Sequence, residues 1–118
     1  MVRPPAQVLE RTSMAIRHII GFEQNPQAIQ TLQEQYKERR QIDKNLGIEC
    51  GVKFFSLQFG GSDVSRASIQ YDYENLAALE QANEKRDADA RWGELNQALF
   101  ASGFNLTFSG IAYDITEA

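Results

Sequence analysis

The sequence predicts one α+β domain, with four antiparallel strands and helices packed on one face of the sheet. Segments with a hydrophobic period of two alternate along the chain with segments of helical period. Asparagine, aspartate and glycine stand where the helical segments are expected to begin and end. With 118 residues, 42% of them hydrophobic, the chain is long enough for a single modest core.

The first predicted strand spans residues 15–22. One of its faces is apolar apart from a histidine, and consists of Ile16, His18, Ile20 and Phe22. The opposite face carries Ile19. Because both faces have apolar side chains, we expect this strand to be central in its sheet and covered on both sides.

A helix is predicted to begin at Pro26 and to end at Leu46. Asn25 is a favourable N-cap, and proline suits the first helical position, where no N–H is needed. Gly47 supplies a left-handed residue after the helix. The expected buried stripe consists of Ile29, Leu32 and Tyr36. The basic side chains interleave with acidic ones and predict a solvated face made of Lys37, Arg39, Arg40 and Lys44.

Two strands follow, over residues 52–59 and 65–73. The glycine-rich segment at residues 60–63 is typical of a hairpin turn that joins such strands. The second of the two alternates cleanly, with one apolar face made of Ala67, Ile69, Tyr71 and Tyr73. That alternation is typical of a half-exposed antiparallel strand.

A second helical region is predicted after Asn75, which serves as its N-cap. Its apolar stripe begins with Leu76, Leu79 and Ala82. An aspartate, Asp87 or Asp89, is expected to interrupt the region and to cap a further helix. The stripe of that helix consists of Trp92, Leu95 and Leu99, and the helix is expected to end at Gly103.

The last predicted strand spans residues 105–115. We expect Leu106 and Phe108 to lie on one face and Ile111, Tyr113 and Ile115 on the other. The change of face is expected near Gly110, because a glycine inside a strand often marks a bulge or a close backbone approach.

The resulting order βαββαβ is the ferredoxin-like arrangement, an α+β fold with a four-stranded antiparallel sheet and helices on one face. The strands nevertheless carry apolar side chains on both faces. An uncovered apolar sheet would exceed the few hundred Å² that monomers normally expose. We therefore expect a homodimer in which a second copy covers the open face. The alternative is a monomer whose open face is partly polar.

Two segments resemble a known group of proteins. The sequence Ile-Arg-His-Ile-Ile-Gly-Phe at residues 16–22 resembles the opening strand of the dimeric α+β barrel superfamily, especially its stress-responsive and antibiotic-biosynthesis-monooxygenase-like branches. Residues 73–79 and the Asp-Ala-Arg-Trp sequence at residues 89–92 are similar to its second helical region. The resemblance covers most of residues 14–115. It implies a homodimeric barrel that binds a small hydrophobic or aromatic molecule.

What the resemblance implies about activity stays open between two classes. One class is a cofactor-independent monooxygenase or isomerase-like enzyme. The other is a non-catalytic dimeric structural or interaction domain. A pocket of several hundred Å³ with converging polar groups around His18 would favour the first class.

His18 is the candidate catalytic residue. Imidazole is the side chain best placed for acid–base work near neutral pH, and in cyclase-like members of the superfamily a histidine of the opening strand lines the pocket. Those members also rely on a second histidine, whereas His18 is the only one here. A packed, hydrogen-bonded core histidine is the alternative interpretation.

The resemblance implies that a polar group stabilises a deprotonated ligand, a role open here to Arg17, Asn105 or Arg66. The expected ligand-binding set combines aromatic walls for a flat molecule with one cation. It consists of Trp92, Tyr36, Tyr71, Phe54 and Arg17. The alternative for Trp92 is that it anchors its helix in the core.

Several other functions are not expected. A formal net charge of −4 leaves no basic excess for binding nucleic acid. No apolar run approaches the roughly 20 residues of a membrane span. His18 has no partner at a metal-ligand spacing, and we expect neither a metal nor a cofactor.

The same composition suggests the compartment and the domain bounds. Cys50 is the only cysteine, cannot form an intrachain disulfide, and is expected to be structural in a reducing cytoplasm. Residues 1–13 are predicted to be a polar extension of a domain at 14–118, and they lack the apolar middle region of a signal peptide.

Overall fold

The computed structural model describes residues 15–57 and 66–116. The elements in chain order are β1 (Ile16–Glu23), α2 (Pro26–Asn45), β2 (Gly51–Leu57), β3 (Arg66–Tyr73), α3 (Leu76–Asp87), α4 (Ala90–Ala101) and β4 (Leu106–Tyr113). The predicted order, with its divided second helical region, is confirmed. The predicted extension at residues 1–13 and the predicted turn at residues 60–63 lie outside the described residues.

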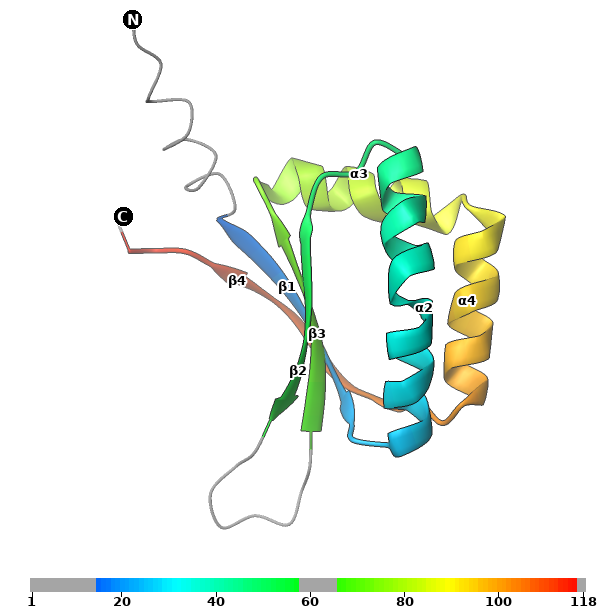
Figure 1. The fold of residues 1–118 in the computed structure, drawn as a ribbon. Coiled ribbons are helices and arrows are strands. Elements are labelled where there is room, and N and C mark those ends of the chain that lie inside the picture. Colours follow the sequence, from blue (N-terminus) through cyan, green and yellow to red (C-terminus); the bar gives the residue numbers. More distant parts are fainter. Residues whose placement is uncertain (1–14, 58–65, 117–118) are drawn as a thin grey trace, which may run out of the picture.

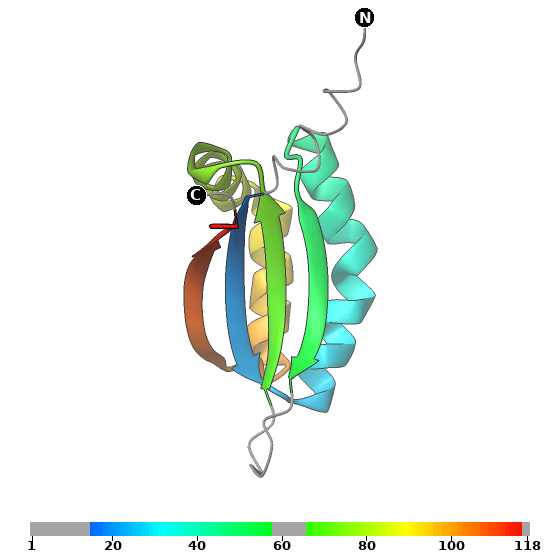
Figure 2. The same cartoon turned by 90° about the vertical axis from the view of Figure 1, so that its left-hand side faces the viewer.

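The four strands form one antiparallel sheet in the order β2-β3-β1-β4. The helices lie together on one side of this sheet (Figure 1). Figure 2 looks onto the other side, which none of the described helices covers; α4 runs behind β1 and β3, and none of these helices runs behind β4. This is the predicted ferredoxin-like α+β fold.

Strand β1 is central, as its two apolar faces predicted, because it pairs with both β3 and β4. The register places His18 between Tyr71 of β3 and Ile111 of β4. Side chains at His18 and Tyr71 therefore share the face of the sheet that the helices cover. Side chains at Arg17 and Asp72, which are also register partners, share the open face.

Helix α2 begins as its sequence predicts. The side-chain oxygen of Asn25 accepts hydrogen bonds from the backbone N–H groups of Gln27 and Ala28, at 2.9 and 3.2 Å. At the other end Gly47 follows the C-cap with a φ of +74°, a left-handed conformation that glycine adopts without strain.

The predicted buried stripe of α2 is wrong at Tyr36, which is 37% exposed. The buried residues of α2 are Ala28, Leu32, Gln35, Arg39, Ile42 and Asp43. The stripe follows a spacing of three and four residues that passes through polar positions. Hydrophobicity alone could not reveal it, because half of its members are polar or charged.

The predicted solvated basic face is likewise wrong at Arg39, which is only 7% exposed. Its neighbour in the stripe, Gln35, donates a hydrogen bond from Nε2 to the backbone oxygen of Leu95 in α4, at 3.1 Å. Helix α4 therefore packs over this part of α2 and buries Arg39 with it.

Helices α3 and α4 are capped separately. Asn75 accepts a hydrogen bond from the N–H of Ala78 at 2.8 Å, and Asp89 accepts one from the N–H of Trp92, also at 2.8 Å. Of the two predicted aspartates, Asp89 is therefore the cap. No helix within the described ranges is long and apolar enough to cross a membrane.

Strand β4 differs from its predicted form. The irregularity in its pairing lies opposite Gly21 and Phe22, which pair with Phe108 and Leu106, and not near Gly110. One extra residue at this bulge puts Leu106 and Phe108 on opposite faces of the sheet, where a common face was predicted. The ring of Phe108 lies against Gly21, where a Cβ atom would come within 2.0 Å of it. The bulge therefore depends on a glycine in β1.

Every residue of β4 is exposed in the single chain. The exposed fractions reach 54% at Leu106 and 56% at Tyr113, and Phe108 and Ile111 are also more than two-fifths exposed. The cause is visible in the layer arrangement, since the helices stop short of this edge (Figure 2).

Candidate functional site

A cavity of about 270 Å³ lies between the helix-covered face of the sheet and helices α3 and α4; we call it the His18 cavity. Its aromatic walls are Tyr71, Trp92, Phe100 and Phe104. The polar side chains that line it are His18, Arg39, Asn83, Arg86, Asp87, Asn96 and Ser109. Apolar walls with a few convergent polar groups are the usual composition of a small-molecule site.

A wider depression of about 680 Å³ lies beside the C-terminal half of α2, between Tyr36 and Cys50. Its charged rim includes Lys37, Arg40 and Lys44. Side chains such as exposed lysines keep their rotamer freedom, and binding a ligand would have to order them. The His18 cavity is therefore the better-formed candidate site.

His18 projects from the centre of β1 and is half-buried. Its Nε2 lies 2.9 Å from the hydroxyl oxygen of Ser109 on β4, and these two atoms form a hydrogen bond. Burial lowers the pKa of His18 below its ordinary value of 6.5, and the charge of Arg86 lowers it further. The imidazole is therefore neutral at neutral pH, and one of its nitrogens can accept a proton.

Trp92 forms the part of the wall that two buried arginines contact. The guanidinium carbon of Arg39 lies 4.7 Å from the centroid of the Trp92 ring, and that of Arg86 lies 5.0 Å from it. Arg86 also lies over the ring of Tyr71, at 4.6 Å. These distances are within the range of cation–π attraction, so the aromatic wall and the positive charges hold one another in place.

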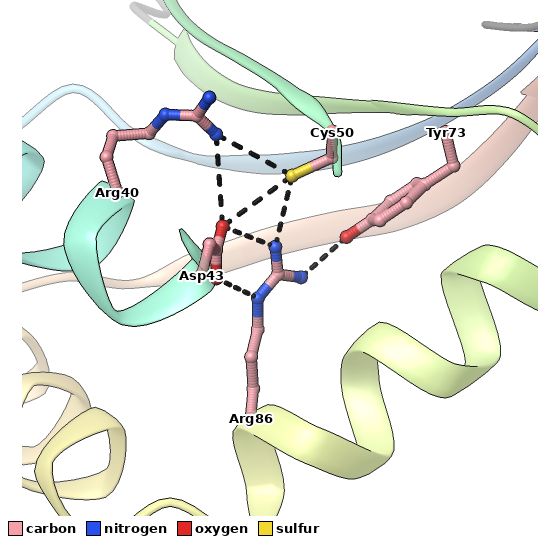
Figure 3. Close-up of polar contacts among 5 residues, drawn as sticks. All are labelled: Arg40, Asp43, Cys50, Tyr73 and Arg86. Carbon is pink, nitrogen blue, oxygen red and sulfur yellow. Dashed lines mark hydrogen bonds and ion pairs between the residues drawn. The ribbon is translucent and has the colours of Figure 1, made fainter. Parts of the chain in front are cut away.

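Arg86 also belongs to a group of interacting side chains beside the cavity (Figure 3), and we call Arg40, Asp43, Cys50, Tyr73 and Arg86 the Asp43 cluster. Arg86 donates from Nε and Nη2 to the two carboxylate oxygens of Asp43, at 2.9 and 2.8 Å. Its Nη1 donates to the hydroxyl of Tyr73 at 2.5 Å. All three nitrogens of Arg86 therefore have protein acceptors.

The Asp43 cluster has the electrostatics of a structural ion pair. Burial alone would lower the pKa of Arg86, but the hydrogen bonds that it donates to Asp43, together with the influence of Tyr73 and Tyr71, raise that pKa overall. Burial raises the pKa of Tyr73 to about 12. Burial also raises the pKa of the Cys50 thiol, which is therefore protonated at neutral pH. This thiol is not an activated nucleophile.

Arg39 has fewer partners than Arg86, although it is almost as deeply buried. Its Nε donates to the side-chain oxygen of Gln35 at 2.9 Å. Its Nη2 is buried and has no hydrogen-bond partner among the described residues. Burial lowers the pKa of Arg39, yet a guanidinium keeps its charge in proteins.

The structure brings three of the predicted site residues together, because His18, Tyr71 and Trp92 all line the His18 cavity. It places the other three elsewhere. Tyr36 and Phe54 pack edge to face, with ring centroids 5.6 Å apart, outside that cavity. Arg17 is on the open face of the sheet, where its Nε lies 2.7 Å from the carboxylate of Asp72.

Sequence reasoning missed the two arginines of the cavity. A signal for Arg39 was present, since it lies seven residues after Leu32 and four after Gln35 on one helical stripe. For Arg86 the spacing from Leu79 and Ala82 gives the same signal. Both were overlooked because a charged residue is normally assigned to the solvent side of a helix.

Over the described ranges, no group of three or more His, Cys, Asp and Glu side chains is placed to hold a metal ion. The side chains that line the His18 cavity offer a neutral imidazole, two guanidinium ions, amides, hydroxyls and a carboxylate.

The chain is similar in fold to ferredoxin-like α+β proteins. In this chain a cavity lies between the sheet and the helices. Among solved structures, a monooxygenase from the gene ActVA-Orf6 of Streptomyces coelicolor, in complex with the ligand Nanaomycin D, is similar at a TM-score of 0.58. The identity is 10%, and the match covers 89% of each chain. At that identity the likeness shows a shared fold.

A conserved protein from Methanosarcina mazei Go1 also matches, at a TM-score of 0.45 and 15% identity, over 89% of this chain and 97% of the other. No protein-family model matches the sequence. No curated protein matches it either.

Proposed function

We propose that this protein is a homodimer that binds a small aromatic molecule in the His18 cavity and acts on it with His18 as a proton acceptor. The observation that carries the proposal is the cavity itself, in which a neutral imidazole, aromatic walls and positive charge converge on about 270 Å³. A cavity that served only packing would be filled by apolar side chains.

The reaction class we propose is cofactor-independent monooxygenation or an isomerase-like proton transfer. In both, removal of a proton from the bound molecule creates an anion, and nearby positive charge stabilises it. His18 supplies the first of these functions and the guanidinium of Arg39 the second, because both side chains line the same cavity. The solved monooxygenase with the same fold is consistent with this class.

The dimer is proposed from strand β4. Its exposed apolar side chains lie at the edge of the sheet, on both faces, and the helices of the same chain leave them uncovered. A second copy that packs against this edge would bury Leu106, Ile111 and Tyr113. It would also close the His18 cavity at the side lined by Leu106 and Ser109.

The binding proposal is tested by titrating the protein with flat aromatic compounds such as naphthols. Trp92 is the only tryptophan, so its fluorescence reports on the cavity directly. Asn96→Phe, which adds bulk to the lining, is expected to abolish binding, whereas Gln97→Phe on the exposed side of the same helix should leave it intact. Equal binding by both variants would contradict the site.

The catalytic proposal is tested by comparing turnover of the bound compounds, in the presence of dioxygen, between the wild type and His18→Ala. Loss of turnover with retained binding supports His18 as the proton acceptor. Unchanged turnover would remove His18 from the mechanism. Binding without turnover of any compound would instead favour a non-catalytic binding domain.

The dimer is tested by light scattering at micromolar concentration. The chain mass is 13.3 kDa, and we expect twice that value. Ile111→Lys should shift the mass to that of a monomer, and Leu76→Lys, an equally exposed apolar position on α3, should leave the dimer unchanged. A wild-type mass near that of one chain would contradict the dimer.

A further inference from the structure

We propose that the ligand of the His18 cavity is an aromatic carboxylate, and that Arg39 binds its carboxylate group. This inference rests on the proposed function, because it specifies the chemistry of the molecule that the cavity takes. The observation behind it is a buried guanidinium with an unused donor. Arg39 lines the cavity, is 7% exposed, and leaves Nη2 without an acceptor in the described part of the chain.

A buried cation without an anionic partner is costly, because the protein interior does not replace the hydration that the ion loses. Arg39 has the neutral amide of Gln35 as its hydrogen-bond acceptor and forms no ion pair with any described carboxylate. Burial lowers the pKa of Arg39, and the nearby positive charge of Arg86 lowers it further. A negatively charged ligand would offset both the burial of the Arg39 charge and its repulsion from Arg86.

We do not expect Arg86 to bind the carboxylate group of the ligand. Its fork already holds the carboxylate of Asp43, and the remaining nitrogen donates to Tyr73. The two charges of that pair compensate each other. Arg39 therefore holds the excess positive charge deep in the cavity, and Asp87, the carboxylate of the lining, is an exposed residue that does not pair with it.

The aromatic wall of the cavity indicates that the rest of the ligand is planar. Trp92 lies under the guanidinium of Arg39, so a planar molecule that follows the indole surface brings its end towards that guanidinium. A carboxylate matches the planar fork of arginine and accepts strong, charge-assisted hydrogen bonds. An aromatic ring with an attached carboxylate satisfies the wall and the unused donor together.

The test compares two probes of nearly the same shape, 2-naphthoate and 2-naphthamide, by calorimetry at pH 7.5 and by Trp92 fluorescence. Wild-type protein is expected to bind the carboxylate at least about tenfold more tightly, as charged hydrogen bonds warrant. In Arg39→Met the preference should fall to about twofold or less, while the amide still binds. Arg39→Lys should keep part of it, because it keeps the charge.

Arg91→Met is the matched control, since Arg91 is an exposed arginine that pairs with Glu38 and Glu94 away from the cavity. It should keep the full preference. Equal binding of both probes by the wild type, or an unchanged preference in Arg39→Met, overturns the inference and leaves an aromatic-binding cavity in place. Absence of binding by either probe overturns the proposed function, and the inference with it.

Discussion

Two buried arginines under the same helical layer have opposite surroundings. Arg86, in the Asp43 cluster, donates a hydrogen bond from every side-chain nitrogen to a protein acceptor and pairs with the carboxylate of Asp43. Arg39, in the His18 cavity, has one amide acceptor and an orphaned Nη2 in the described residues. The first arrangement is what a folded core needs. The second leaves a buried donor without an acceptor in the described part of the chain.

The difference shows that the charges of the Asp43 cluster depend on one another, whereas the charge of Arg39 in the His18 cavity has no partner among the described residues. In the Asp43 cluster, removing one charge strands the other inside the protein. In the His18 cavity, removing the charge of Arg39 strands no ion. Stability and binding should therefore respond to different arginines.

The largest effect is expected for Asp43→Ala, which leaves Arg86 as an unpaired buried cation. We expect the free energy of unfolding to fall by about 3–5 kcal/mol. Urea denaturation followed by circular dichroism measures it. Asp87→Ala, at an exposed carboxylate of α3, is the control and should change stability by less than about 0.5 kcal/mol. Similar losses for the two variants would erase the distinction between the cluster and the surface.

A smaller loss is expected for Tyr73→Phe, which removes the acceptor of Arg86 Nη1. A hydrogen bond to a charged group contributes about 1.5–3 kcal/mol, and we expect a loss in that range. Tyr36→Phe, at an exposed tyrosine of α2, is the matched control. A neutral effect of Tyr73→Phe would mean that the cluster consists of the Asp43–Arg86 pair alone.

The same tyrosine predicts a dependence on alkaline pH. Its pKa is about 12 in the folded protein and near 10 in an unfolded chain. Its contribution is therefore complete below pH 10 and is lost as the pH rises towards 12. Urea midpoints measured across that window should decline less steeply for Tyr73→Phe than for the wild type. Parallel declines would contradict the assignment.

Arg39→Met is expected to change the free energy of unfolding by no more than about 1 kcal/mol in either direction. The loss of the hydrogen bond that Arg39 donates to Gln35 is offset by removal of an uncompensated buried charge. The same denaturation experiment measures it. A loss as large as that of Asp43→Ala would show that Arg39 is structural, and the contrast between the two arginines would fail.

The smallest effect concerns His18, whose pKa is lowered from 6.5 by burial and then by Arg86. Neutral His18 favours the folded state, so this contribution is present above pH 6.5 and is lost as the pH falls through the lowered folded value. As the only histidine, it gives a single imidazole signal in an NMR titration. A midpoint at or above 6.5 would contradict the influence of the cavity.

Most of the fold was predictable from local patterns. The helix starts were predictable from N-cap residues, which act on the backbone N–H groups two or three positions later. These residues are Asn25, Asn75 and Asp89. The apolar alternation of β3 predicted its buried face. The bulge in β4 was misplaced because its position is set by the contact between Phe108 and Gly21, two residues far apart in the chain.

The site was predictable only in part, for the same reason. His18, Tyr71 and Trp92 lie on elements whose buried faces the sequence indicates. The burial of Arg39 depends on how α4 packs over α2, and the contact between Gln35 and Leu95 that reports this packing spans 60 positions. No pattern within one helix encodes such a contact.

The central position of β1 in the sheet has a consequence for folding during synthesis. Its two neighbours are synthesised long after it, and the hydrogen bond between His18 and Ser109 joins residues 91 positions apart. One edge of β1 must therefore wait for β4 to leave the ribosome, and pairings of such high contact order form slowly. Until then the backbone groups along that edge of β1 have no strand to pair with, and an unpaired strand edge favours association with other chains.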